Sequence, residues 1–291
     1  MGRGKLHSIK RRIESTRSTE HITHAMEMVA TAKVNKVVRL WRSYLGYVDA
    51  IDQVVSDCLS DMEGLEHPLI LKPGFEPRKI SLFTITSDMG LCGSFNLDVL
   101  RTAEQFGAKH KPAFAGHFVV GTKGWNYLRY RKQILLYAQD KLYDTPGYSI
   151  AEMLANRVLS LFEEGKTDSI QVLFSEFRSS LVQRPAIRPL LPLQLPEPKA
   201  GEYRVEYEFE PQPMKFFQSI IPLYLSAHIL AFLLEAKVSE LYSRQNAMRN
   251  ATENAENMIE RFTLEFNKAR QGAITQEIIE IVNGAEALAE S

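Results

Sequence analysis

The hydrophobic positions of the C-terminal quarter of the chain follow a helical period. From about Met214 to Ala289, apolar residues recur every three or four positions, and the helix breakers are limited to Pro222, Gly272 and Gly284. This spacing predicts an amphipathic helix, with its apolar side chains on one stripe. At 1.5 Å per residue the helix would be roughly 100 Å long. A helix of that length cannot bury its stripe alone, so it needs a second long helix or a surrounding partner.

The N-terminal region supplies a second long helical pattern. From about Leu6 to Met62 there is no proline, and Gly46 is the only internal glycine. We predict a helix of roughly 85 Å that pairs with the C-terminal helix in an antiparallel coiled coil. Its predicted apolar stripe consists of Ile9, Ile13, Ile22, Met26, Val29, Val37, Leu40, Trp41, Tyr44, Leu45, Val48, Ile51, Val54, Val55, Cys58, Leu59 and Met62.

The middle of the chain alternates between strand and helix patterns. Helices are expected at about 96–106, 123–130 and 149–164, and for the last of these Ser149 and Glu152 form a candidate capping box. This alternation predicts a small, mostly parallel, Rossmann-like α/β domain. The strands are expected at Lys79–Thr86, His117–Val120, Gln133–Ala138 and Ser169–Ser175, with a possible last strand at Tyr203–Phe209.

Turn residues and prolines set the expected boundaries between these parts. Gly64, Pro68, Pro73, Gly74 and Pro77 mark a linker, and five prolines in 184–200 indicate an edge strand or loop. The predicted fold class is α/β plus a long antiparallel coiled coil, in which the terminal helices form a shaft that carries the α/β domain. The expected parts are an N-terminal shaft helix (1–62), a linker (63–77), a central α/β domain (78–210) and a C-terminal shaft helix (211–291).

Four sequence blocks resemble one known family. The first and second are Ile22-Thr23-His24-Ala25-Met26-Glu27-Met28-Val29-Ala30-Thr31-Ala32-Lys33 and Ser87-Asp88-Met89-Gly90-Leu91-Cys92-Gly93-Ser94-Phe95-Asn96. The third and fourth are the run 240–255, ELYSRQNAMRNATENA, and the run 274–285, ITQEIIEIVNGA. Together, and in this order, they resemble the gamma subunit of F-type ATP synthases, and they span nearly the whole chain.

The resemblance implies a rotor shaft without catalytic residues or cofactors of its own. The expected partners are the alpha and beta subunits of the head, the epsilon subunit and the membrane c-ring, on the cytoplasmic side of a bacterial membrane. Neither nucleic acid nor directly bound nucleotide is expected. The resemblance places partner or coupling contacts at Met26, Lys33, Arg244, Gln245, Gln271, Thr275 and Glu277, and a structural turn at Gly90 and Gly93.

Charge is balanced over the chain but unevenly placed. The 35 basic and 35 acidic residues give a formal net charge of +0, so no overall field favours nucleic acid or a membrane. Residues 1–42, however, contain ten Lys or Arg against three Glu, a net of +7. A solvated helix face accounts for such a run. An alternative is an acidic partner, which the resemblance supplies on the beta subunits.

The middle domain also permits an enzyme hypothesis. A glycine-rich turn after a first strand is where dinucleotide-binding folds hold phosphates. The turn Gly90-Leu91-Cys92-Gly93 lacks the G-x-G-x-x-G pattern, however, and the chain contains no P-loop sequence. Cys92 at a helix start is a candidate nucleophile, with His110 or His117 as a possible base. The alternative is a thiol buried in a tight turn.

Other candidate sites are weaker. His21 and His24 lie three apart on one predicted helix, but the sequence supplies no third metal ligand at a matching spacing. No run reaches eighteen consecutive apolar residues, so no transmembrane helix is expected. The N-terminus resembles neither a secretory signal nor a transit peptide. A static coiled-coil scaffold is the third hypothesis, although it predicts strict heptads where this stripe drifts.

Overall fold

The structure is a computed structural model that describes residues 2–61, 67–71, 74–141, 146–193 and 213–289. It contains two compact units. The first combines residues 1–30 with 245–291, and the second comprises residues 31–244. Two long helices contribute to both units: α1 spans Gly2–Asp61 and α5 spans Pro213–Ala289, with 60 and 77 residues. The predicted fold class, two long terminal helices with a mostly parallel α/β domain, is confirmed.

The first unit is an antiparallel helix pair. The Thr23 and Thr252 hydroxyls lie 2.8 Å apart, and Arg249 donates a hydrogen bond to Glu27 at 3.0 Å. Towards the N-terminus of α1, the guanidinium of Arg12 lies 6.0 Å from the centre of the Phe262 ring. Residue numbers fall along α1 as they rise along α5, so the two helices run in opposite directions.

The predicted stripe of α1 is only partly buried. Ile9 is 2% and Val55 4% exposed, whereas Ile22 and Val29 are each 58% exposed. A single helix neighbour covers a narrow seam, so apolar residues beside that seam remain open to other partners. The prediction that Ile22 and Val29 are buried within the helix pair is therefore wrong. The side chain of Cys58 lies outside the described residues.

The second unit contains a five-stranded sheet in the order β3-β2-β1-β4-β5. Four strands are parallel: β1 (Ile80–Ile85), β2 (Phe114–Val120), β3 (Leu135–Gln139) and β4 (Ser169–Phe177). The antiparallel edge strand is β5 (Gln183–Leu191), which contains two of the prolines noted above. Proline cannot donate a ladder hydrogen bond, so an edge is where a sheet tolerates it.

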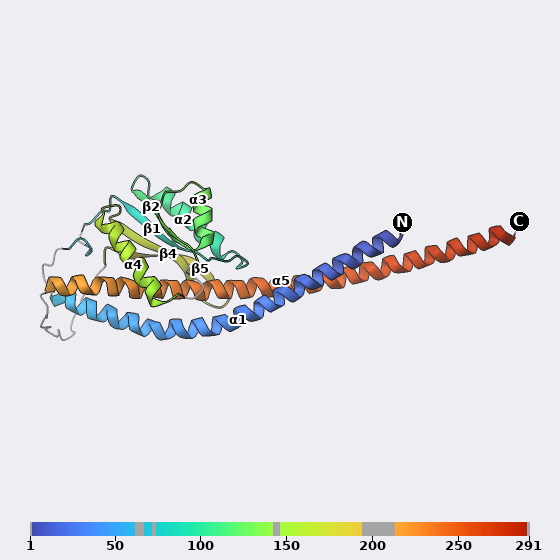
Figure 1. The fold of residues 1–291 in the computed structure, drawn as a ribbon, viewed down its shortest axis with the longest axis horizontal. Helices are drawn as coiled ribbons and strands as arrows, with labels where there is room; N and C mark the ends of the chain where they lie inside the picture. Colours follow the sequence, from blue (N-terminus) through green and yellow to red (C-terminus); the bar gives the residue numbers. More distant parts are fainter. Residues whose placement is uncertain (1, 62–66, 72–73, 142–145, 194–212, 290–291) are drawn as a thin grey trace. The chain divides into compact units, whose positions relative to one another are not determined.

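Helices cover both faces of this sheet (Figure 1). On one face, α2 (Phe95–Lys109) and α3 (Thr122–Tyr130) enclose two small apolar clusters. On the other face, α4 (Tyr148–Glu163) and the first part of α5 enclose the largest cluster. That cluster includes Phe83, Phe118, Phe174, Leu154, Phe217, Leu225 and Leu233. The α/β domain is thus built directly onto α5.

Several element boundaries differ from the predicted ones. The capping box at Ser149 is wrong, because α4 begins at Tyr148 after an extended Gly147 and has no side-chain cap hydrogen bond. The strand predicted from His117 begins at Phe114, and the strand predicted from Gln133 begins at Leu135. Sequence patterns predict whether a segment is a helix or a strand more accurately than they predict where the segment begins and ends. The possible strand Tyr203–Phe209 and parts of the 63–77 linker lie outside the described residues.

One window in α5 meets the length and hydropathy of a membrane span. The window lies within residues 215–283, has a mean hydropathy of 1.7 and is 61% buried inside the structure. A core helix of a folded domain meets the same criterion. Its burial against the sheet accounts for this apolar stretch.

Candidate functional site: the crevice at the carboxyl ends of β1 and β4

The strand order of the sheet reverses between β1 and β4. The chain moves from β1 to β2 and β3 on one side, and then returns to place β4 on the other side. In open α/β sheets, ligands bind in the crevice outside the carboxyl ends of the strands at such a reversal. The loop that leaves β1, residues 86–94, borders this crevice, and we call it the β1 loop. Its contacts decide whether the crevice is available to a ligand.

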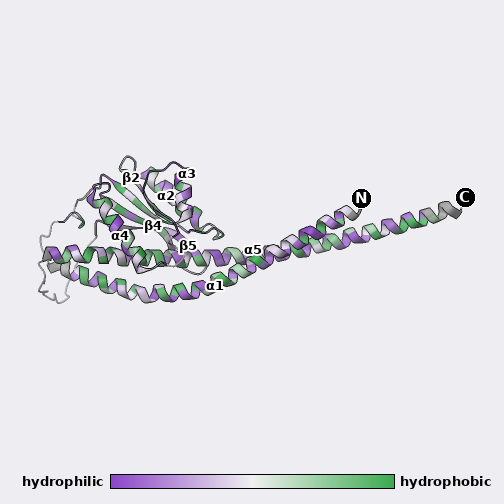
Figure 2. Cartoon of the chain, viewed as in Figure 1, coloured by the Kyte–Doolittle hydropathy of each residue, from purple (hydrophilic) through white to green (hydrophobic). Residues whose placement is uncertain are grey.

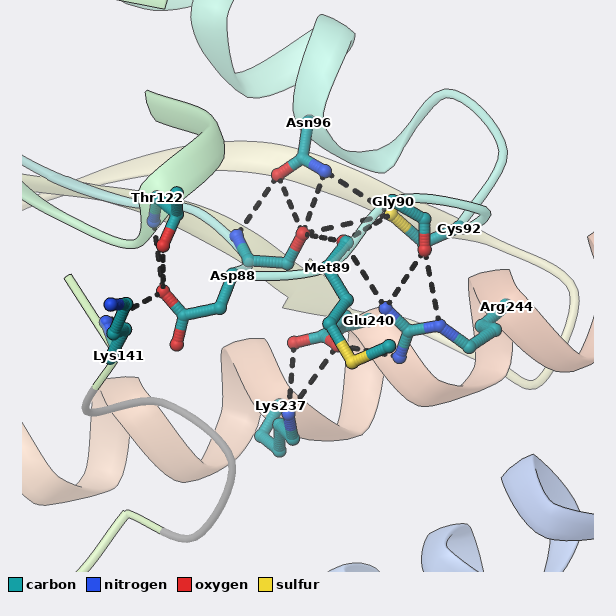
Figure 3. Close-up of polar contacts among 11 residues, drawn as sticks. Asp88, Met89, Gly90, Cys92, Asn96, Thr122, Lys141, Lys237, Glu240 and Arg244 are labelled. Atoms are coloured by element: carbon teal, nitrogen blue, oxygen red, sulfur yellow. Dashed lines mark hydrogen bonds and ion pairs between the residues drawn. The ribbon is translucent and has the colours of Figure 1, made fainter. Parts of the chain in front are cut away.

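Hydrogen bonds within the domain hold the β1 loop in shape. The Ser87 backbone N–H donates to the Asn96 side-chain oxygen at 3.0 Å, and the Asn96 amide donates to the Ser87 hydroxyl at 2.7 Å. The Asp88 carboxylate accepts hydrogen bonds from the backbone and hydroxyl of Thr122 at 2.9 and 2.8 Å. It also accepts one from the Lys141 backbone at 3.1 Å (Figure 3). Asp88 therefore caps the start of α3, where a carboxylate is favoured by the helix dipole.

The two glycines of the predicted turn have different roles. Gly93 has a φ of 57°, in the left-handed region that favours glycine. Gly90 has no such constraint, because an added Cβ would make only ordinary contacts, with the Lys123 side chain. The other left-handed residue of the loop is Leu91, with a φ of 60°. Strain at a non-glycine residue persists only where the surroundings fix the backbone, so contacts from outside the loop are expected to hold it in this conformation.

The C-terminal helix holds the β1 loop from the crevice side. The Ser243 hydroxyl donates to the Cys92 carbonyl at 2.7 Å. The Arg244 guanidinium donates to the Gly90 carbonyl from two nitrogens, at 3.4 and 3.3 Å, and to the Met89 carbonyl at 3.4 Å. Figure 3 shows the guanidinium directed at these carbonyls. Two consecutive residues of α5 thereby bind three carbonyls of the loop.

A buried ion triad positions this arginine. Glu240 accepts from Arg244 at 2.6 Å, one helical turn away, and its carboxylate lies 3.2 Å from the Lys237 ammonium. The Lys237, Glu240 and Arg244 side chains are only 6%, 2% and 11% exposed. Charges so far from water must be paired, and breaking one pair is costly. The triad carries a net charge of +1, which faces the partial negative charge of the carbonyls. We call the triad, Ser243 and the β1 loop the latch.

The carboxyl end of β4 is also joined to α5. The Glu235 carboxylate accepts a hydrogen bond from the Phe177 backbone at 3.1 Å, and burial raises the pKa of Glu235. The Phe177 ring stacks on Tyr242 with centroids 5.1 Å apart and meets the edge of Trp41 at 5.9 Å. Residues 235–244 of α5 therefore lie against the carboxyl ends of β1 and β4, where a dinucleotide-binding fold would place its ligand.

The geometry does not support Cys92 as a nucleophile. Cys92 is 2% exposed, and burial raises the pKa of its thiol, although the Ser87 hydroxyl opposes that shift. The described hydrogen bonds of the thiol are with Ser87, Asn96 and the Met89 carbonyl, and include neither histidine. The His110 ring contacts the Phe106 carbonyl, and burial lowers the pKa of His117 to about 4. The cysteine is a buried thiol in a tight turn, as the structural alternative predicted.

The predicted coupling residues do not form one cluster. Arg244 belongs to the latch, and Met26 is half-buried in the helix pair of the first unit. The Thr23–Thr252 and Glu27–Arg249 contacts place Met26 level with residues 249–252. Lys33, Gln271, Thr275 and Glu277 are exposed along the two helices. Their roles as partner contacts remain predictions.

Sequence reasoning missed the partners of Arg244. Lys237 and Glu240 were not singled out, although both lie in a largely apolar part of a predicted packing helix. Their spacing from one another and from Arg244 is three and then four residues, which places all three on one helix face. Charges at that spacing on a buried face predict a paired network, and this signal was available in the sequence.

Sequence comparisons place the chain in a known family. The ATP synthase family profile matches residues 5–288. The chain is 36% identical to the ATP synthase gamma chain of Brevibacillus brevis, over 98% of this chain and 99% of the relative. It is 37% identical to the ATP synthase gamma chain of Pelotomaculum thermopropionicum, over 97% and 99%.

Solved structures show the same fold. A chain from the mitochondrial ATP synthase of Euglena gracilis, in its OSCP/F1/c-ring assembly, matches with a TM-score of 0.70 and 17% identity, over 98% of this chain and 95% of that chain. A chain of the central stalk and c-ring of the Tetrahymena thermophila mitochondrial ATP synthase matches with a TM-score of 0.62 and 24% identity, over 79% and 99%. The fold agrees with these structures, and the identity of 36–37% to two gamma chains extends over nearly the whole chain. The chain therefore belongs to the ATP synthase family, as one of its gamma chains.

Proposed function

We propose that this chain is a non-catalytic shaft that transmits torque between a membrane ion-driven ring and the catalytic alpha and beta subunits. As a gamma chain it is a subunit of the central stalk of a membrane-bound ATP synthase. We propose that ATP is made and hydrolysed on other subunits. This chain contributes a stiff shaft whose orientation differs relative to each catalytic subunit. The coupling is reciprocal, since each conformation of a catalytic subunit favours one face of the shaft.

The observation that carries this proposal is the uncovered end of α5. Within the described part of the first unit, every residue from Gln271 to Asn283 is exposed except the half-buried Ala273. Apolar and polar residues alternate along this end (Figure 2). The exposed apolar side chains include Ile274 at 49%, Ile278 at 55%, Ile281 at 71% and Val282 at 49%. Exposed apolar patches of this kind mark interaction surfaces. A sleeve of alpha and beta subunits around the helix would cover them.

The filled crevice supports the absence of catalysis. Where a doubly wound domain would bind a nucleotide, Arg244 and Ser243 already bind the β1 loop. The same contacts fix the α/β domain to α5, so a load on the domain is borne by the helix through several hydrogen bonds and a buried ion triad. A torque-bearing connection needs this stiffness, because a loose joint would dissipate rotation as local bending.

The α/β domain and the basic N-terminal region supply the remaining proposed contacts. We assign the epsilon subunit and the c-ring to the α/β domain, on the cytoplasmic side of a bacterial membrane. The net +7 of residues 1–42 favours acidic segments on the beta subunits. The residues proposed to meet the alpha and beta subunits lie on the two long helices: Met26, Lys33, Gln245, Gln271, Thr275 and Glu277.

Reconstitution tests this function directly. The purified chain should neither hydrolyse ATP nor bind it tightly, whereas its addition to alpha and beta subunits should restore ATPase activity that depends on it. A marker attached to the α/β domain should rotate during turnover. Turnover by the chain alone that is lost in Cys92→Ser would support an enzyme instead. ATPase activity that requires the chain without any rotation would support a static scaffold.

A further inference from the structure

Two turns of the α/β domain place basic residues at one edge of the sheet. The turn before β2, which follows Lys109 at the end of α2, contains His110 and Lys111, and the turn before β3 contains Arg131 and Lys132. Strands β2 and β3 are parallel neighbours, so their amino ends share an edge. The His117 backbone donates to the Ile134 carbonyl at 2.8 Å, which joins the start of β3 to β2 at this edge. The two basic turns therefore lie side by side.

The charge of this region is not balanced locally. Residues 101–132 contain seven Lys or Arg and a single acidic residue, Glu104, in a chain whose formal net charge is +0. Glu104 pairs with Arg131 at 2.7 Å. Five of the basic residues, all exposed, form what we call the basic rim: Lys109, Lys111, Arg129, Arg131 and Lys132.

Two exposed side chains within the rim are not explained by charge. Tyr130 is 83% exposed and Ile134 is 60% exposed. Cations in the last turn of a helix complement its dipole, which accounts for Lys109 in α2 and Arg129 in α3. The helix dipole does not explain why Tyr130 and Ile134 are exposed to solvent among these cations. Their presence points to a surface that buries them.

We propose that the basic rim binds an anionic lipid surface. Lys and Arg residues near anionic headgroups each favour binding, and tyrosine is preferred at the boundary between headgroups and acyl chains. The rim lies on the ends of α2 and α3 and on the turns that follow them, so its long, exposed side chains can adapt to a plane of mobile charges. An acidic protein would instead need a fixed pattern of carboxylates to match these turns.

The proposal goes beyond the rotary role and does not rest on it. It concerns the basic rim alone, whereas the torque-bearing role was argued from α1, α5 and the latch. Lipid contact is compatible with a subunit of a membrane-bound complex, since it would add a weak, salt-sensitive attraction without fixing one orientation. A fluid lipid surface presents the same chemistry at every angle of rotation.

Vesicle flotation with the purified full-length chain tests the proposal. The probe is a phosphatidylcholine vesicle with or without phosphatidylglycerol, at low and high salt. We expect binding only to the anionic vesicles, and weaker binding at high salt because counterions screen the charges. Arg129→Gln with Lys132→Gln should lower the affinity by roughly thirtyfold, if each cation near the surface contributes about 1 kcal/mol.

A matched control separates the rim from overall charge. Lys36→Gln with Arg39→Gln removes the same charge from exposed positions of α1, in the strongly basic N-terminal region. This variant should bind anionic vesicles nearly as well as the parent chain. Equal losses in both double variants would overturn the proposal, since binding would then follow net charge alone.

Tyr130 supplies a second readout that charge does not control. Tyr130→Ala keeps every cation, and its exposed position makes a folding defect unexpected. It should weaken vesicle binding severalfold, and the loss should persist at high salt. No binding of the parent chain to anionic vesicles, or a Tyr130→Ala variant that binds like the parent, would overturn the proposal. A rim variant that impairs only assembly with other subunits would assign the rim to an acidic protein partner.

Discussion

The Glu240 carboxylate and the Arg244 guanidinium meet at 2.6 Å, one turn apart on α5, and both side chains are buried. Because Glu240 holds one nitrogen of the guanidinium, the other nitrogens are directed at the Met89 and Gly90 carbonyls. One carboxylate on the helix thus positions the guanidinium that binds the β1 loop. This contact joins α5 to the α/β domain through the β1 loop.

Glu240→Gln should destabilise the second unit. Glutamine keeps the size of the side chain but removes the negative charge between two buried cations, so Lys237 and Arg244 would repel each other in a dry environment. Loss of one member of a buried ion network costs about 3–5 kcal/mol. Urea unfolding monitored by circular dichroism measures the change in the free energy of unfolding.

Glu253→Gln is the control for this variant, since Glu253 is an exposed glutamate on the same helix. Its effect should stay within about 0.5 kcal/mol. If Glu240→Gln costs no more than Glu253→Gln, the triad does not hold the latch. In the assembled complex, Glu240→Gln should also reduce ATP-driven ion pumping more than ATP hydrolysis, because a looser joint transmits less torque.

His117 should make the domain acid-sensitive. Its ring is fully buried on β2, and burial lowers its pKa to about 4, whereas the nearby Glu104 opposes that shift. The unfolded chain, with an ordinary pKa of about 6.5, binds more protons than the folded chain between these values. Stability should therefore be complete above about pH 6.5 and fall as the pH is lowered towards 4, by up to about 3 kcal/mol.

His117→Leu removes this titration. The variant should lose stability less steeply than the parent chain between about pH 6.5 and 4, while other groups still titrate. Neither ring nitrogen of His117 has a hydrogen-bond partner among the described atoms, so leucine leaves no donor or acceptor unpaired. Free energies of unfolding across this pH range measure the difference. Parallel curves for the two proteins would show that His117 does not contribute.

The periodic parts of the fold were predictable because burial imposes a period. Both long helices and all four parallel strands follow from the spacing of apolar residues. Their ends were less predictable, since the start of α4 depends on the extended Gly147 and not on the hydroxyl of Ser149. The extent of burial on α1 was also overestimated, because a periodic stripe does not say how many neighbours cover it. Ile22 and Val29 follow the period and remain exposed.

The candidate site was predictable only in part. The glycine-rich turn after β1 and the importance of Arg244 came from the sequence and the family resemblance. The contact between them did not, because it joins residues 154 positions apart. Long-range contacts of single polar groups have no periodic signal. Only the i, i+3 and i+7 placement of Lys237, Glu240 and Arg244 on an apolar helix indicated that these charges must be paired.

The Thr23–Thr252 hydrogen bond should stabilise the helix pair modestly. Each hydroxyl can also donate to its own helix, Thr23 to the Glu20 carbonyl and Thr252 to the Met248 carbonyl. A single valine therefore leaves the other hydroxyl with an acceptor, and Thr23→Val or Thr252→Val should cost about 1 kcal/mol. The double variant should cost less than the sum of the two single variants.

Thermal unfolding of the four proteins completes this double-mutant cycle. The coupling energy should be about 0.5–1 kcal/mol in favour of the native pair. Strictly additive effects would mean that the two hydroxyls do not contact each other in solution. That result would also count against the register that places Met26 level with residues 249–252.

Met26→Lys should weaken coupling without preventing assembly. Met26 is half-buried, so a lysine there can extend its ammonium to the surface of the helix pair. If this level of the stalk faces acidic segments of the beta subunits, as we propose, the new cation gains a contact in one orientation. A partly exposed ion pair contributes about 1 kcal/mol. That contact would hold one rotary position and oppose the others, whereas the flexible, uncharged methionine has no strong preference.

ATP hydrolysis and ATP-driven ion pumping, measured in the same membranes, distinguish this effect from a folding defect. We expect Met26→Lys to retain most of its hydrolysis and lose much of its pumping. Met26→Gln, which has a similar size and no charge, should retain both. The alternative is that Met26 mainly packs within the helix pair, near Arg249, where lysine would add repulsion and reduce assembly. In that case hydrolysis and pumping should fall together with the amount of assembled complex, and Met26→Gln should show part of the same loss.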